Sequence, residues 1–124
     1  MIKKFRPVKI LTMCRVGLSR SLALADVLKF HFVPTDVIPV GVSANSAETL
    51  KYMVDWADKV VLMREKFRNE LEEKIGVPLP NEKILICEVG ADVHGYVGQN
   101  RAILIDKAWR WARANQKELG VVEK

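Results

Sequence analysis

Cysteine is scarce in this sequence, and long apolar runs are missing. Its 124 residues include two cysteines, Cys14 and Cys87, which are too few and too widely separated for a disulfide scaffold or a tetrahedral zinc site. The longest apolar stretches fall far short of the ~18 residues that a membrane-spanning helix needs. The N-terminal segment MIKKFRPVKI lacks the apolar region and small-residue cleavage site of a signal peptide. We therefore expect a cytoplasmic protein with reduced thiols, without a metal, a cofactor or a membrane partner.

Acidic residues are in the minority. The chain has 15 Asp and Glu against 20 Lys and Arg, a net charge of +5 that favours anionic ligands. Because no DNA- or RNA-binding signature accompanies this charge, we expect a basic solvated surface, and nucleic acid is an unlikely partner class. The length, with 49% apolar and 28% charged residues, fits one globular domain over residues 1–124.

Strand-like apolar segments alternate with segments of helical periodicity. We expect strands at 7–13, 37–42, 59–63 and 83–89. We expect helices at 21–32, 64–75 and 99–119, and Gly76 should end the second of these. A further helix should begin after Asn45, which we expect to cap it because Glu48 follows three residues later. Nearly continuous apolar strands separated by helices indicate a four-stranded parallel sheet with helices on both faces, a small doubly wound α/β domain.

The loop after the first expected strand brackets a cysteine and an arginine. In open parallel sheets, ligands bind at the carboxyl ends of the strands, where backbone N–H groups of the loop and of the next helix point at the ligand. Such a ring of donors suits a phosphate, and the planar guanidinium of an arginine can hold two of its oxygens. We therefore predict that phosphate is bound by the segment Arg15, Val16, Gly17, Leu18, Ser19, Arg20 and Ser21.

Cys14 is the candidate nucleophile of this loop. The positive field of the loop is expected to lower the pKa of its thiol, so that a thiolate forms near neutral pH. Ser21 can donate a hydrogen bond to that thiolate when a covalent phosphocysteine is hydrolysed. The alternative is a small buried apolar residue, because a lone cysteine near a strand end usually has that role. The strand before the loop, the helix after it, and the Gly and Ser within it favour the phosphate-binding interpretation.

At these residues the chain resembles the cysteine-dependent phosphatases, which share the loop C-x5-R-[ST], here CRVGLSRS. Dual-specificity phosphatases carry a similar loop, but they place their general acid upstream, and no acidic residue precedes Cys14. The order of elements is instead similar to that of the low-molecular-weight protein tyrosine phosphatases. The segment ADKVVLMREKFRNEL, residues 57–71, resembles the third strand and helix of their small bacterial predicted tyrosine-phosphatase branch.

This resemblance implies a protein tyrosine phosphatase-like hydrolase. Such an enzyme cleaves a phosphorylated protein or a small phosphate ester through a phosphocysteine at Cys14, with Arg20 holding the phosphate. It also implies a general acid on a late loop, although the family's Asp-Pro dipeptide is absent. Asp92 is our choice, because it lies between glycines in the loop after the fourth strand, where the small bacterial branch has acidic residues. Glu88 and His94 remain alternatives, and Tyr96, with His94, is a candidate wall against the substrate.

Other functions stay open. Sugar phosphotransferase IIB components carry C-x-x-G-x-S-T-S at the same turn, and CRVGLSRS differs mainly in having Arg20 where they have Thr. Arsenate reductases of this fold use the same loop but need a relay of further cysteines, and Cys87 is expected in the core. A catalytically weak phosphate-binding domain is the third possibility, if Asp92 is badly placed.

Overall fold

The computed structural model describes residues 7–15, 19–33, 35–88 and 98–124. Its main sheet contains four parallel strands, β1 (Val8–Cys14), β3 (Thr35–Gly41), β4 (Lys59–Leu62) and β5 (Ile84–Ile86), in the order β3-β1-β4-β5. The central strand β1 pairs with β3 on one side and with β4 on the other. The four-stranded parallel sheet predicted from the apolar segments is confirmed.

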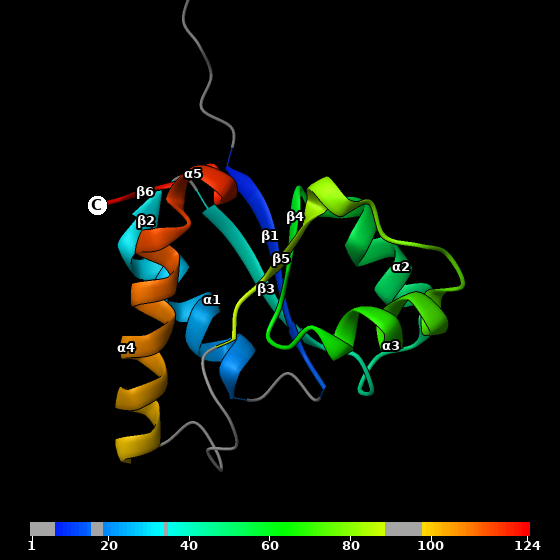
Figure 1. Ribbon diagram of the computed structural model, residues 1–124, viewed down its shortest axis with the longest axis horizontal. Coiled ribbons are helices and arrows are strands. Elements are labelled where there is room, and N and C mark those ends of the chain that lie inside the picture. The colour runs from blue at the N-terminus through cyan, green and yellow to red at the C-terminus, as the bar shows by residue number, and fades with distance from the viewer. Residues whose placement is uncertain (1–6, 16–18, 34, 89–97) are drawn as a thin grey trace, which may run out of the picture.

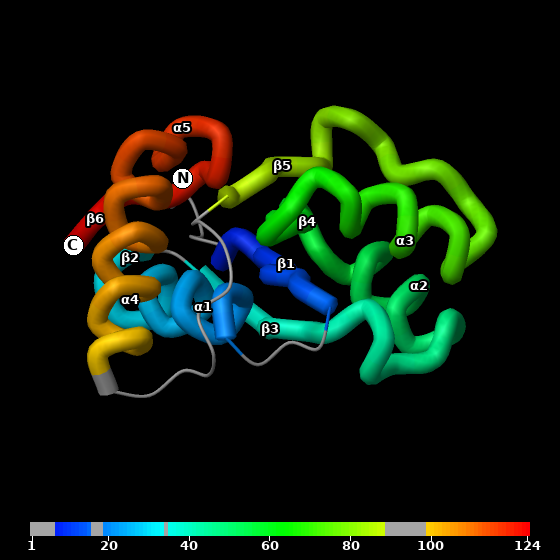
Figure 2. The backbone as a smooth tube through the Cα atoms, turned by 60° about the horizontal axis from the view of Figure 1, so that its bottom comes forward, coloured from blue at the N-terminus to red at the C-terminus, as the bar shows by residue number. Residues whose placement is uncertain are grey.

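Helices cover both faces of this sheet (Figure 1). On one face lie α1 (Arg20–His31) and α4 (Gly98–Ala114), and on the other lie α2 (Ala47–Trp56) and α3 (Lys66–Ile75). Figure 2 shows the same division from a second angle. The doubly wound α/β architecture is therefore also as predicted. None of the helices in the described ranges is both long and apolar enough to cross a membrane.

The core is centred on β1 and α1. In β1, Ile10, Leu11 and Met13 have no exposed surface, because helices cover both faces of the central strand. In α1, Leu24 and Leu28 are equally buried, and buried residues surround most of the helix because it lies between the sheet and α4. The strand and helix that flank the predicted phosphate loop thus both belong to the core of the fold.

The cap of α2 differs from the prediction. Ser46, not Asn45, caps the helix, since its Oγ accepts a hydrogen bond from the backbone N–H of Thr49 (3.2 Å). Asn45 instead donates from Nδ2 to the carbonyl oxygen of Gly41 (2.8 Å) and so closes the turn after β3. The prediction of Asn45 as the cap was wrong because the turn uses its side chain.

Several predicted boundaries also move, three of them for clear structural reasons. The helix expected at 21–32 ends at His31, because Phe32 is extended and begins β2 (Phe32–Val33). The helix expected at 99–119 is divided at Asn115 into α4 and the short α5 (Gln116–Leu119). The strand expected at 83–89 is reduced to β5, because the 3-10 turn η1 (Asn81–Lys83) precedes it and its pairing with β4 ends at Ile86. The predicted end of α3 is confirmed, with Gly76 in the left-handed region at φ 79°.

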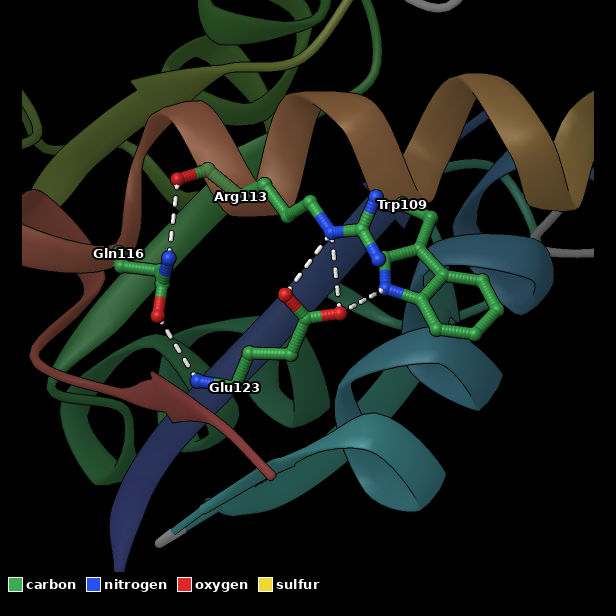
Figure 3. Close-up of polar contacts among 4 residues, drawn as sticks. All are labelled: Trp109, Arg113, Gln116 and Glu123. Atoms are coloured by element: carbon green, nitrogen blue, oxygen red, sulfur yellow. Dashed lines mark hydrogen bonds and ion pairs between the residues drawn. The ribbon is translucent and has the colours of Figure 1, made fainter.

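The contacts that hold the C-terminal strand were not predicted. We call the group of residues that makes them the C-terminal latch: Trp109, Arg113, Gln116 and Glu123. The strand β6 (Val122–Glu123) pairs antiparallel with β2. Figure 3 shows how Glu123 is held: its Oε2 accepts from Nε1 of Trp109 (2.7 Å), and its two carboxylate oxygens accept from Nε of Arg113 (2.8 and 3.0 Å). Gln116 contacts both partners, accepting from the backbone N–H of Glu123 (2.8 Å) and donating to the carbonyl of Arg113 (3.2 Å). These contacts fasten the last strand to α4, near the amino end of β1 in Figure 1.

Candidate functional site

Cys14 is the last residue of the central strand, at the carboxyl edge of the sheet. From β1 the chain passes to β3 on one side and returns to β4 on the other, so that the helices after β1 and β4, α1 and α3, lie on opposite faces. In doubly wound sheets, ligands bind outside the carboxyl ends of the strands at such a switch point. The fold therefore places Cys14 where a binding crevice is expected.

The thiol of Cys14 has a fixed hydroxyl as its neighbour. Its Sγ lies 3.2 Å from Oγ of Ser21, and the Cys14 side chain is only 4% exposed. Ser21 is itself buried, and its carbonyl accepts a hydrogen bond from Oγ1 of Thr12, which is also buried (2.8 Å). Thr12 thereby joins the first turn of α1 to the strand that carries Cys14. A thiolate sulfur can only accept, so in that form the Ser21 hydroxyl would be the donor.

The backbone around Cys14 is held by the turn after β3. The carbonyl of Cys14 accepts from the N–H of Val42 (2.9 Å), and the carbonyl of Arg15 accepts from both the N–H and the Oγ of Ser43 (2.9 and 2.6 Å). Ser43 was not predicted, because nothing in the local sequence pattern shows that this turn reaches the first strand. Two neighbouring strand ends thus fix the entry to the loop.

Arg20 is the first residue of α1, and the carbonyl of Ser19 accepts from the N–H of Ala23 (3.0 Å). The N–H groups of this first turn face the same end of the sheet as Cys14, and no acidic residue lies in the turn. Both the partial positive charge of the helix end and the guanidinium favour an anion there.

The helix α3 forms a second side of the site. The guanidinium carbon of Arg20 lies over the ring of Phe67, 6.0 Å from its centre, and Nζ of Lys66 lies 5.8 Å from the same centre. Glu70, one turn further along α3, forms an ion pair with Arg15, in which its Oε1 accepts a hydrogen bond from Nη2 (2.9 Å). Phe67 and Glu70 were not predicted, because their i, i+3 spacing indicates a shared helix face but not that this face lies beside Arg15 and Arg20.

The second cysteine lies at the same edge of the sheet. Cys87 follows β5 and donates its N–H to the carbonyl of Leu62 (2.8 Å), while Leu62 is the register partner of Met13. Met13 and Ile86 are both register partners of Leu62, and Cys14 and Cys87 are the residues that follow them. Because β4 lies between the two cysteines, they are about 10 Å apart at the usual strand spacing. A disulfide needs Cα atoms within about 7 Å. Cys87 is fully buried, and burial raises the pKa of its thiol, as expected for a core residue rather than a resolving thiol.

The structure describes part of the predicted site. As expected, Arg15 follows β1, while α1 begins with Ser19 as its N-cap, followed by Arg20 and Ser21. The Arg15 side chain is 55% exposed. The predicted loop residues Val16, Gly17 and Leu18 lie outside the described residues, as do the proposed acid Asp92 and the wall residues His94 and Tyr96. Glu88, the alternative acid, is exposed and follows Cys87 at the edge that carries Cys14.

No family model matches the chain, and no curated protein matches it by sequence. Solved structures do match. Wzb from Vibrio vulnificus, in complex with benzylphosphonate, is 16% identical with a TM-score of 0.56, over 86% of this chain and 97% of its own. A low molecular weight protein tyrosine phosphatase from Bacillus subtilis is 16% identical with a TM-score of 0.57, over 88% and 97%. The YwlE arginine phosphatase from Geobacillus stearothermophilus is 19% identical with a TM-score of 0.55, over 90% and 97%. The chain therefore has the fold of the low-molecular-weight protein tyrosine phosphatases.

Proposed function

We propose that this protein is a cysteine-dependent phosphomonoesterase of the protein tyrosine phosphatase type, with Cys14 as its nucleophile. The observation that carries the proposal is the 3.2 Å approach of the Ser21 hydroxyl to the Cys14 sulfur, at the switch point of a doubly wound sheet. A buried apolar cysteine needs no such partner. A cysteine that alternates between thiolate and phosphocysteine does, because its charge changes during the reaction.

In the first step, the Cys14 thiolate attacks the phosphorus atom, and the bond from phosphorus to the leaving oxygen breaks as the sulfur–phosphorus bond forms. Charge on the non-bridging oxygens is met by the guanidinium of Arg20 and by N–H groups of the loop and of the first turn of α1. Most of the catalysis of phosphoryl transfer comes from such positioning and charge stabilisation. The leaving oxygen takes a proton from a general acid, for which Asp92 is the first candidate.

In the second step, water attacks phosphocysteine, giving up a proton to the same carboxylate, and the sulfur leaves as a thiolate with release of inorganic phosphate. The hydroxyl of Ser21 donates to the departing sulfur, and its position is fixed through the bond from Thr12 to the Ser21 carbonyl. Thr12 is therefore a positioning residue in this proposal, while Ser21 contacts the reacting atom.

Among the other functions left open by the sequence, arsenate reduction is disfavoured. It requires a cysteine relay, and the register places Cys87 too far from Cys14 for a direct disulfide. A phosphocysteine carrier does not need an arginine clamp, so Arg20 at the start of α1 favours hydrolysis. The similar structures include a tyrosine phosphatase and an arginine phosphatase, so phosphoarginine, which has a phosphorus–nitrogen bond, is the alternative substrate to test against a phosphate ester.

The test is hydrolysis of p-nitrophenyl phosphate by the wild type and four variants. Cys14→Ser should abolish turnover, and Arg20→Ala should lower kcat/KM by about 100-fold or more, the usual cost of a lost donor to a developing charge. Asp92→Asn should lower kcat by about 100-fold if Asp92 is the acid. Cys87→Ala, which removes the other thiol, should retain the wild-type rate.

Wild-type turnover no faster than that of Cys14→Ser would overturn the phosphatase proposal. A full rate for Asp92→Asn would overturn only the assignment of the acid, and Glu88→Gln would then be tested in its place. Phosphotyrosine and phosphoarginine, offered in parallel, separate the two classes of scissile bond. Acid quenching during turnover of radiolabelled substrate should leave label on the wild type but not on Cys14→Ser, as a phosphocysteine requires.

A further inference from the structure

Glu70 places a carboxylate beside the arginine that follows Cys14. Its Oε1 lies 2.9 Å from Nη2 of Arg15, and the two side chains are 36% and 55% exposed. Arg15 is held at its backbone by both the N–H and the Oγ of Ser43. The Glu70 carboxylate therefore pairs with the side chain of the residue that follows the nucleophile, at an exposed position that an approaching ligand can reach.

The helix that carries Glu70 is anchored around the site. One turn before Glu70, the ring of Phe67 lies under Arg20 and Lys66. One turn after it, Nζ of Lys74 donates to the carbonyl of Val42 (2.7 Å), and the N–H of Val42 donates to the carbonyl of Cys14 (2.9 Å). Glu70 thus occupies a fixed position between two attachments to the elements that hold Cys14.

This carboxylate opposes the charge of the rest of the protein. With a net charge of +5, and with Arg15, Arg20 and Lys66 near the Cys14 edge, the surface by itself favours acidic substrate segments. Glu70 pairs with Arg15, so the two side chains together carry no net charge. An acidic side chain that approaches Arg15 has to compete with Glu70, and without the Glu70 charge Arg15 would attract that side chain.

We propose that Glu70 is a specificity-determining residue, which raises activity towards phosphorylated peptides with a basic side chain beside the phosphorylated residue relative to peptides with an acidic one. The proposal rests on the phosphatase function proposed above. The phosphate of a phosphotyrosine lies at the end of its side chain, so the flanking residues of the peptide stay at the rim of the site, where the exposed side chains of Arg15 and Glu70 lie. Glu70 selects through the flanking charge and takes no part in the chemistry.

The test compares two phosphotyrosine peptides that differ only in the residues on either side of the phosphotyrosine, lysine in one and aspartate in the other. Glu70→Gln should lower the ratio of kcat/KM for the lysine peptide to kcat/KM for the aspartate peptide by about two- to fivefold relative to the wild type, the range expected for one exposed charge pair. Glu70→Lys should lower it further, and added salt should reduce the difference between the wild type and Glu70→Gln.

Glu73→Gln is the matched control. Glu73 is exposed on the same helix but lines a different hollow, together with Asn69 and Gly76, and the substitution changes the net charge equally. An unchanged ratio in Glu70→Gln, or an equal change in Glu73→Gln, would overturn the inference while the phosphatase proposal stands. A wild type without Cys14-dependent turnover of p-nitrophenyl phosphate would overturn the phosphatase proposal and this inference with it.

Discussion

The sulfur of Cys14 lies 3.2 Å from the hydroxyl oxygen of Ser21, and both residues are buried. Ser21 is positioned through its backbone carbonyl, which accepts from Thr12, so its hydroxyl remains available to the sulfur. Replacement of Ser21 therefore removes a hydrogen bond from the sulfur without removing the bond that joins α1 to β1.

Ser21→Ala should slow the breakdown of phosphocysteine more than its formation. A hydrogen bond to a charged group contributes about 1.5–3 kcal/mol, so the steady-state kcat should fall by roughly 10- to 100-fold. Stopped-flow measurement with p-nitrophenyl phosphate should show a burst of product that approaches the enzyme concentration. Ser21→Thr, which keeps the hydroxyl, should recover part of the rate, and a Ser21→Ala variant with the wild-type rate and no burst would contradict this role.

Hydrogen peroxide should inactivate the protein without joining its two cysteines. The register keeps Cys14 and Cys87 about two strand spacings apart, and Cys87 is a buried thiol whose pKa is raised by burial. Mass spectrometry of the oxidised protein should show oxygen added at Cys14 rather than a bond between the two residues. Cys87→Ala should be inactivated at the wild-type rate, and an internal disulfide found in the wild type would contradict the register argument.

Glu123→Gln should lower the melting temperature at neutral pH but have little effect in acid. The hydrogen bond from Arg113 is the main cause of the lowered pKa of Glu123, and the bond from Trp109 adds to it. A carboxylate with a lowered pKa stabilises the folded state above its unfolded pKa, and this contribution is lost as the pH falls through the folded pKa. The melting temperatures of wild type and variant should therefore converge as the pH falls from the ordinary pKa of a glutamate through the lowered pKa of Glu123. A constant difference across the pH range would show that the charge of Glu123 is not what holds the strand.

Gly76→Ala should destabilise the fold by about 1 kcal/mol, because Gly76 has a φ of 79° at the end of α3. A Cβ there would meet no atom within 4 Å, so the cost is conformational and not steric. Gly76→Asn should cost less, since asparagine tolerates the left-handed region better. Urea unfolding of the three proteins checks this order, and equal losses for Ala and Asn would contradict it.

The parallel sheet could be predicted because β1, β3 and β4 are buried and apolar, and because a helical pattern separates them. The small sheet of β2 and β6 could not, since each strand has two residues and forms only when distant parts of the chain meet. Asn45 and Ser46 are both good caps, and only the tertiary position of Gly41 decides which one binds the helix.

At the site, the positions of Cys14, Arg20 and Ser21 could be predicted because a strand, a loop and a helix follow one another along the chain, while their catalytic roles stay predictions. Glu70 and Ser43 could not, because they meet the loop across 55 and 28 residues of sequence. Local spacing carries no information on such contacts. The acid stays a prediction, as Asp92 lies outside the described residues.

The latch around Glu123 and the Cys14 site lie at opposite ends of β1. Substitutions that strengthen or weaken the contacts of the C-terminal strand are therefore expected to change the stability of the folded state without changing the groups proposed to react. Heat resistance and turnover are in this sense separate properties of the chain, and selection, in the laboratory or in nature, can alter one while the other stays constant.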